Sequence, residues 1–295
     1  MFFTKLQWRL IGLGVLSGNE PPTAYSEQHS YQHDGVLQGR SINNGMQLRI
    51  LPLGASITAG LRSTTGDGYR KELQDRLEND GNEVTYVGTQ FHGTMTDNAC
   101  EAYSGYTIER LDNATLVSGA LEFLPNVILL NIGTNNCGLK AKDPSEAPSQ
   151  YRTLLDHIKT RDADALVVVS SLLPNLNAKV NTCVQNLNVA IRRVAREAAS
   201  RGQRIAIVDM YDAVPTSDIN TKDGTHPNDD GYSRMAEVWY NGIVAAARNI
   251  SAPESGGRAP LKSPGPRGAA SISRPSILAA SGLLAGVFAA AILAY

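Results

Sequence analysis

Short apolar runs alternate with longer amphipathic segments between about Gln47 and Ile250. The runs are rich in β-branched residues and apolar throughout, which is typical of strands covered on both faces, and the longer segments have apolar residues at helical spacing. The predicted strands are residues 48–53, 84–88, 126–133, 165–171 and 204–210, and the predicted helices are residues 69–80, 148–161, 180–201 and 230–249. This alternation predicts an α/β domain of three layers, with helices on both faces of a mainly parallel five-stranded sheet.

The segments that follow three of these strands carry candidate chemistry. Ser56 follows the first strand in ILPLGASITAG, Asn135 follows the third in GTNN, and Asp223 and His226 follow the fifth in DGTH. The carboxyl ends of parallel strands lie at one edge of a sheet, where ligands bind in folds of this class. We therefore expect these side chains to share one edge.

A serine hydroxyl becomes a useful nucleophile when a base takes its proton and a third group holds that base. Ser56 alone, beside glycine, indicates only a turn. Asp223 and His226 are three positions apart, so Asp223 can orient His226, and His226 can reach Ser56 across the strand ends. Metal binding is a weaker interpretation, since one histidine with scattered carboxylates is not a zinc pattern.

Hydrolysis of an ester also needs hydrogen-bond donors for the negative oxygen that forms during attack. The backbone N–H of Ser56 can be one donor and the side-chain amide of Asn135 another. Gly105, in EAYSGYTIERL, precedes an apparent helix, where a free N–H would point toward a bound anion. Each of these signals is weak alone, but together they predict one catalytic edge.

Four stretches resemble the conserved blocks of the SGNH (GDSL-type) hydrolases, in the order of that family: PLGASITAG, YSGYTI, LLNIGTNN and DGTHPNDDGY. Three stretches are similar to carbohydrate esterase family 3, which includes acetyl xylan esterases: STTGDGYRKELQDRL, YSGYTI and MAEVWY. The resemblance implies a flavodoxin-like fold. It also implies a site composed of the triad Ser56, His226 and Asp223 and an oxyanion hole formed by Ser56, Gly105 and Asn135. The chain departs from the family at Ala55, usually Asp, and at Asn136, often Asp.

These features predict a serine esterase that acts on O-acyl groups of carbohydrate, chiefly O-acetyl groups, and requires no metal or organic cofactor. Two alternatives stay open. One is an esterase or lipase for small acyl or lipid esters, and the other is a noncatalytic glycan-binding surface protein, which Ala55 mildly favours. A formal net charge of −1 gives no reason to expect a nucleic-acid partner.

The two ends of the chain differ from the middle. Residues 1–18, with Lys5 and Arg9 before a short apolar run, predict a secretory signal, and residues 19–46 a flexible segment. The hydrolase domain is expected over residues 47–250, followed by a Pro/Gly/Ser-rich linker over 251–275. Residues 276–295 are apolar and about as long as a membrane span; they resemble a signal for glycosylphosphatidylinositol (GPI) attachment, with a retained single-pass anchor as the alternative. We expect an extracellular protein at the cell surface.

An exported protein with three cysteines can pair two of them, and spacing alone does not choose the pair. Because Cys137 and Cys183 fall on predicted loops at the active edge, we expect a bridge between them and a free Cys100. The sequons at Asn113 and Asn249 would be usable for N-glycosylation in a secretory pathway.

Overall fold

A central, mostly parallel sheet organises the computed structural model, which describes residues 42, 45–138 and 144–263. Within these residues the sheet has seven strands, in the spatial order β3–β4–β1–β5–β6–β7, with β2 also pairing with β1. The strands are β1 (Gln47–Gly54), β2 (Glu83–Tyr86), β3 (Gln90–Phe91), β4 (Ala99–Ala102), β5 (Val127–Asn131), β6 (Leu166–Ser170) and β7 (Ile205–Val208). All paired strands run parallel except β3 and β4.

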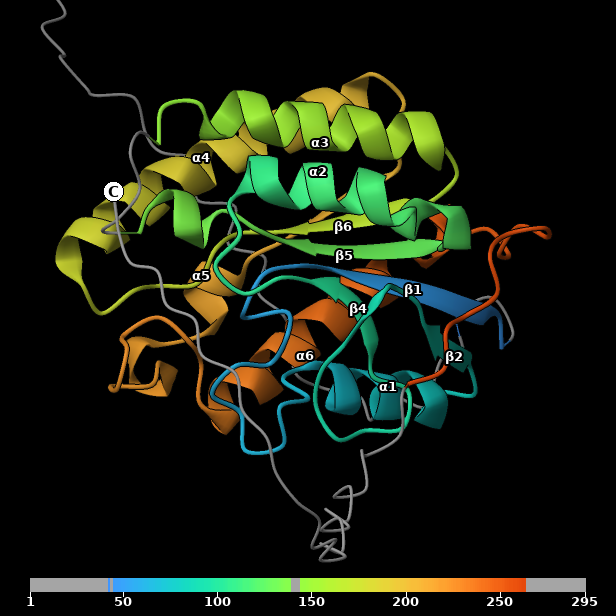
Figure 1. The fold of residues 1–295 in the computed structure, drawn as a ribbon, viewed down its shortest axis with the longest axis horizontal. Coiled ribbons are helices and arrows are strands. Elements are labelled where there is room, and N and C mark those ends of the chain that lie inside the picture. Colours follow the sequence, from blue (N-terminus) through green and yellow to red (C-terminus); the bar gives the residue numbers. More distant parts are fainter. Residues whose placement is uncertain (1–41, 43–44, 139–143, 264–295) are drawn as a thin grey trace, which may run out of the picture. The chain divides into compact units, whose positions relative to one another are not determined.

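Helices cover both faces of this sheet (Figure 1). They are α1 (Arg70–Asn79), α2 (Ile108–Ser118), α3 (Ala147–Arg161), α4 (Ala178–Ser200), α5 (Met210–Ala213) and α6 (Asp229–Ala245). Ile128 and Leu130 of β5 pack in one core with buried residues of α2, α3 and α4, while Val127 and Leu129 pack in a second core with α1 and α6. Successive strand residues thus face opposite layers, and the predicted three-layer α/β fold is confirmed.

The number of strands differs from the predicted five. All five predicted strands are present, but β3 and β4 are additional. β2 pairs only with residues 47–50 of β1, and β4 pairs with residues 53–54, so two strands share one edge of β1. β3 and β4 have two and four residues, and β4 includes the buried Glu101, so neither produces an apolar run in the sequence.

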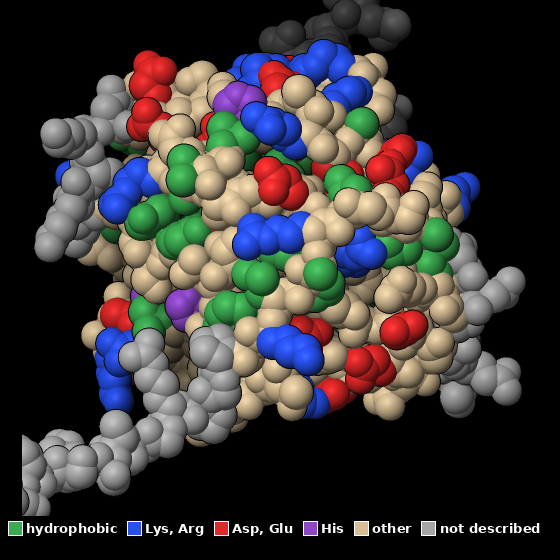
Figure 2. Space-filling model, turned by 45° about the vertical axis from the view of Figure 1, so that its right-hand side comes forward, with side chains coloured by type: hydrophobic (Ala, Val, Ile, Leu, Met, Phe, Trp, Pro, Cys, Tyr) green, Lys and Arg blue, Asp and Glu red, His purple; other side chains and the backbone are tan. Residues whose placement is uncertain are grey.

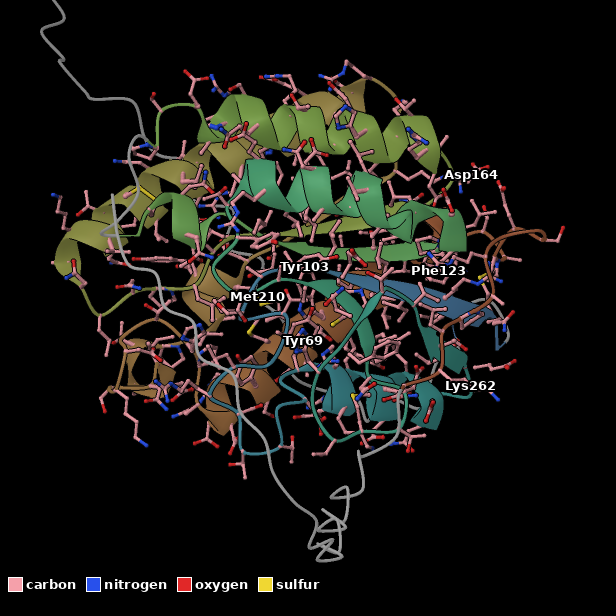
Figure 3. All side chains as sticks on the ribbon, in the orientation of Figure 1. Tyr69, Tyr103, Phe123, Asp164, Met210 and Lys262 are labelled. Atoms are coloured by element: carbon pink, nitrogen blue, oxygen red, sulfur yellow. A yellow bond between two sulfur atoms is a disulfide. The ribbon has the colours of Figure 1, made fainter. Side chains whose placement is uncertain are left out.

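The parallel strands bring their carboxyl ends to one edge, as Figure 3 shows. Phe123 and Asp164, which precede β5 and β6, lie toward one end of the sheet, and Tyr103, which follows β4, lies nearer the other end. The candidate catalytic loops all follow strands, so they lie at the carboxyl ends of the strands, as Tyr103 does.

The folded domain continues beyond its predicted end at Ile250. The Asn126 side chain donates to the Ser251 carbonyl at 2.9 Å, and the backbone N–H of Arg258 donates to the Glu122 carbonyl at 2.7 Å. The Arg258 guanidinium also lies 4.9 Å from the centroid of the Phe123 ring. The first part of the predicted linker therefore packs on the domain, because its backbone and one arginine find partners in the segment before β5.

Other predictions for the ends fall outside the described residues: the signal (1–18), most of the flexible segment (19–41 and 43–44), the rest of the linker (264–275) and the tail (276–295). Ile42, within that predicted flexible segment, is buried, and its N–H donates to Asn82 Oδ1 at 2.9 Å. In residues 42, 45–138 and 144–263, no helix combines the length and the apolar character that a membrane crossing needs.

Cys137 and Cys183 form a disulfide with their Cα atoms 5.5 Å apart (yellow bond in Figure 3). Cys183 lies inside α4 rather than on a loop, so the bridge joins the segment after Asn135 directly to that helix. Cys100 is free and buried, and burial raises the pKa of its thiol to about 11, which suppresses the reactive thiolate.

The two predicted glycosylation sites, Asn113 on α2 and Asn249 at the end of the domain, are both exposed. The hydroxyl of Thr115, the third residue of the first sequon, is buried and donates to the Leu111 carbonyl at 2.8 Å. Whether either asparagine carries a glycan stays a prediction.

Candidate active site

Ser56 stands at the point where β1 turns into the next loop, and its side chain is largely buried. The turn depends on Gly54, the last residue of β1. A Cβ atom at Gly54 would lie 2.2 Å from Thr58 Oγ1 and 2.4 Å from the Asn131 carbonyl oxygen, so only glycine fits. This close approach of β1 to the end of β5 places Ser56 beside the loop that carries Asn135.

His226 connects the nucleophile candidate to a carboxylate. Its Nε2 lies 2.8 Å from Ser56 Oγ, and its Nδ1 lies 3.1 Å from Asp223 Oδ2. The network fits a neutral imidazole that donates from Nδ1 to the carboxylate and accepts the serine hydroxyl proton at Nε2. The structure thus brings together, in hydrogen-bonding order, the three residues that the sequence analysis selected as a triad.

Backbone hydrogen bonds hold the loop that carries the histidine. The N–H of Asn220 donates to the His226 carbonyl at 2.8 Å, and the N–H of Leu176 donates to the Gly224 carbonyl at 2.9 Å. The side chain of Asn175 donates to Thr225 Oγ1 at 3.0 Å. Segments after β6 and before α6 therefore fix the loop from two sides, which keeps the imidazole directed at Ser56.

Asn135 lies in a short 3₁₀ turn (Thr134–Asn136) after β5. Its Nδ2 donates one hydrogen bond to the Tyr106 carbonyl at 2.9 Å, and a primary amide has a second N–H to offer. Asn135 and Ser56 line the same small cavity, and Tyr106 directly follows Gly105. The three proposed oxyanion donors are thus linked through contacts at one edge of the sheet.

Gly105 itself adopts a left-handed conformation with φ of 81°. Its Cβ position is empty of neighbours within 4 Å, so the requirement for glycine comes from the backbone angle rather than from crowding. The loop is exposed, and its N–H is not used by any backbone hydrogen bond described for residues 45–138.

The two departures from the family pattern have different surroundings. Asn136 is buried; its Oδ1 accepts the N–H of Ile108 at 3.0 Å, and its Nδ2 donates to Gln150 Oε1 at 3.2 Å. It therefore ties the Asn135 turn to the first residue of α2. Ala55 packs in the core beneath α2, α3 and α4, so this position makes an apolar contact.

Asp223 accepts several hydrogen bonds from neighbouring protein groups. Its Oδ1 accepts the N–H groups of Thr225 and His226, both at 3.0 Å, and its Oδ2 accepts Arg62 Nε at 2.7 Å. Partial burial raises the pKa of Asp223, but these donors, led by the His226 N–H and the Arg62 side chain, more than offset it and hold the pKa well below its usual range. Asp223 is therefore an anion at any pH at which the protein would work.

Arg62 is the residue that the sequence analysis missed. It lies 161 positions from Asp223, and no spacing or motif in the chain connects the two. Only the folded structure brings the loop after Ser56 against the loop before α6.

The cavity beside Ser56 is small. Its lining residues come from the ends of β1 and β5 and from the histidine loop: Ala55, Ser56, Ile57, Asn131, Ile132, Gly133, Thr134, Asn135 and Thr225. The space open to a water-sized sphere is about 10 Å³. That is roughly the room that one water molecule requires.

Comparison with known proteins gives a consistent result. The GDSL-like lipase/acylhydrolase family model matches residues 53–234, a span that contains all five candidate catalytic and oxyanion residues. The multidomain esterase of Ruminococcus flavefaciens is 28% identical over an alignment of 235 residues, and the match covers 70% of this chain and 30% of that protein. The chain thus spans less than a third of that relative.

Two solved structures share the fold. The Clostridium thermocellum family 3 carbohydrate esterase has a TM-score of 0.58 and 24% identity, covering 68% of this chain and 98% of that one. A family 3 carbohydrate esterase from Talaromyces cellulolyticus has a TM-score of 0.59 and 17% identity, covering 69% of this chain and 100% of that one. Both similarities concern the sheet and helices that position the site.

Proposed function

Because this chain belongs to the GDSL-like lipase/acylhydrolase family, a family of ester hydrolases, we propose that it removes O-acyl groups, chiefly O-acetyl groups, from carbohydrate. The observation that carries the proposal is the continuous hydrogen-bonded series from Ser56 Oγ through His226 to Asp223. A noncatalytic binding protein would not need this series, so the geometry favours an enzyme.

In the proposed mechanism, His226 Nε2 takes the proton of Ser56 Oγ as that oxygen attacks the ester carbonyl. Asp223 stabilises the imidazolium that forms. The carbonyl oxygen becomes an anion that accepts hydrogen bonds from the N–H groups of Ser56 and Gly105 and from Asn135 Nδ2. His226 then protonates the leaving sugar hydroxyl, and the same steps with water release the acid and restore Ser56.

The size of the cavity beside Ser56 supports a short acyl group. A space of about 10 Å³ beside Ser56 has room for a group about as small as the methyl of an acetyl ester, whereas a longer chain directed into this cavity would need the lining to move. Side chains and backbone in such cores resist displacement. The same observation disfavours lipid esters as the natural substrate.

The carbohydrate part of the proposal rests on similarity. The two solved structures named above are described as family 3 carbohydrate esterases and have the same fold, and the sequences of residues 63–77, of the YSGYTI block and of residues 235–240 resemble that family. On the face seen in Figure 2, acidic and basic side chains are interspersed with apolar ones, a surface compatible with a neutral polysaccharide.

Acyl-chain selectivity tests this proposal. The purified protein should hydrolyse p-nitrophenyl acetate with a kcat/KM about 10-fold above that for the butanoate and about 100-fold or more above that for the octanoate, because overpacking costs about 1–3 kcal/mol. Release of acetate from acetylated xylan, measured beside a non-carbohydrate acetyl ester, tests the polymer. An octanoate rate equal to the acetate rate would contradict the short-acyl assignment.

We also propose display at the cell surface, on the composition of the terminal segments alone. If residues 276–295 direct GPI attachment, a phosphatidylinositol-specific phospholipase should release active protein from intact producing cells into the medium. Retention of the protein on treated cells, while a known GPI-anchored protein is released, would favour the membrane-span alternative.

A further inference from the structure

Arg62 binds the same carboxylate oxygen that binds the proposed base. Arg62 Nε lies 2.7 Å from Asp223 Oδ2, and His226 Nδ1 lies 3.1 Å from that oxygen. The side chains are 41% exposed for Arg62 and 23% for Asp223, so the pair lies at the rim of the site. Arg62 and His226 thus both bind the negative charge of Asp223, and the Arg62 bond is the shorter of the two. This is the charge that would stabilise a protonated His226.

The backbone holds Arg62 in this place at a conformational cost. Its φ is 78°, in the left-handed region that residues with a side chain rarely adopt. Neighbouring contacts compensate: Tyr232 Oη donates to the Leu61 carbonyl at 2.7 Å, and the Thr64 N–H donates to Asp229 Oδ1 at 2.8 Å. The loop after Ser56 is therefore fastened on both sides of Arg62 to α6 and to its first turn.

Building on the esterase function proposed above, we propose that Arg62 is a positioning residue that extends activity to lower pH through Asp223. A general base works only in its neutral form. The positive charge of Arg62 disfavours a second positive charge on the neighbouring imidazole, so His226 stays neutral further into the acid range than it would beside Asp223 alone.

The other groups that face this pair do not supply the same effect. Asp229, in the first turn of α6, is held by the N–H and hydroxyl of Thr64. Tyr232 of α6 is neutral, since burial raises its pKa well above the usual range. Arg62 is the cation that hydrogen-bonds Asp223 among residues 42, 45–138 and 144–263.

The pH dependence of kcat/KM tests the inference with an uncharged substrate, p-nitrophenyl acetate. In Arg62→Ala and in Arg62→Gln, the lower midpoint of the profile should move upward by about 0.5–1 pH unit at low salt, and 1 M NaCl should reduce the difference. Arg62→Lys keeps the charge and should keep the midpoint near that of the wild type. Arg152→Ala removes an equal charge from a surface ion pair on α3 and should leave the midpoint unchanged.

A second measurement does not depend on turnover. In full-length Ser56→Ala protein, with and without Arg62→Gln, NMR titration of the His226 ring protons should show the same upward movement; a His226→Gln variant assigns the signals among the five histidines. A loss of rate that is equal at every pH, with an unmoved midpoint and titration, would overturn the inference. If the wild type is no faster than Ser56→Ala, the proposed function fails, and the NMR titration still decides the role of Arg62.

Discussion

Replacement of Ser56 by alanine should lower kcat for p-nitrophenyl acetate by about 10^5-fold or more, the effect known for loss of the nucleophile in serine hydrolases. Without Oγ, no acyl-enzyme forms, and His226 at 2.8 Å from the former hydroxyl has no proton to take. Only the oxyanion donors and substrate binding would contribute to the residual rate.

The measurement compares initial rates of wild type, Ser56→Ala and Ser149→Ala. Ser149 is exposed on α3, away from Ser56, and its loss should leave the rate unchanged. A phosphonate ester that labels active serines should add its mass to the peptide containing Ser56 in the wild type and in Ser149→Ala alone. A wild type no faster than Ser56→Ala, although folded, would contradict the esterase function.

Replacement of Asn135 by alanine should lower kcat by about 100- to 1,000-fold with a smaller change in KM, since one oxyanion donor contributes about 3–4 kcal/mol to the transition state. One N–H of Nδ2 already binds the Tyr106 carbonyl at 2.9 Å, which orients the amide plane and directs the other N–H away from that carbonyl. The side chain also lines the cavity with Ser56.

Asn135→Asp keeps the size of the side chain but removes both of its N–H groups, the one bonded to the Tyr106 carbonyl and the one proposed for the oxyanion. Aspartate has nearly the same shape and is a favourable turn residue, but as a carboxylate it has no N–H and would repel the developing anion. We expect a loss at least as large as that of Asn135→Ala at neutral pH, with a circular dichroism spectrum like that of the wild type. Near-normal activity in Asn135→Asp would exclude Asn135 as an oxyanion donor.

The layout of the fold could be predicted because strands buried on both faces are continuous apolar runs in the sequence. In the helices, apolar residues recur at a spacing of three or four positions. The runs at β1, β5 and β7 also place Ser56, Asn135 and the Asp223–His226 pair, since parallel strands present their carboxyl ends together. Short elements such as β4 leave no such pattern. Glu101 is buried there because Thr89 and Ser118 donate hydrogen bonds to it, and those partners become neighbours only on folding.

The sequence by itself therefore determined the layers of the fold, the edge that carries the chemistry and the residues of the proposed triad. The tertiary structure alone decided how that chemistry is tuned: the room beside Ser56, the bond from Asn136 to the start of α2, and the ion pair of Arg62 with Asp223. The physical reason is that the spacing of apolar residues along the chain indicates which side chains are buried when the protein folds. Contacts between polar side chains far apart in the chain depend on loop paths that only the packed sheet and helices fix.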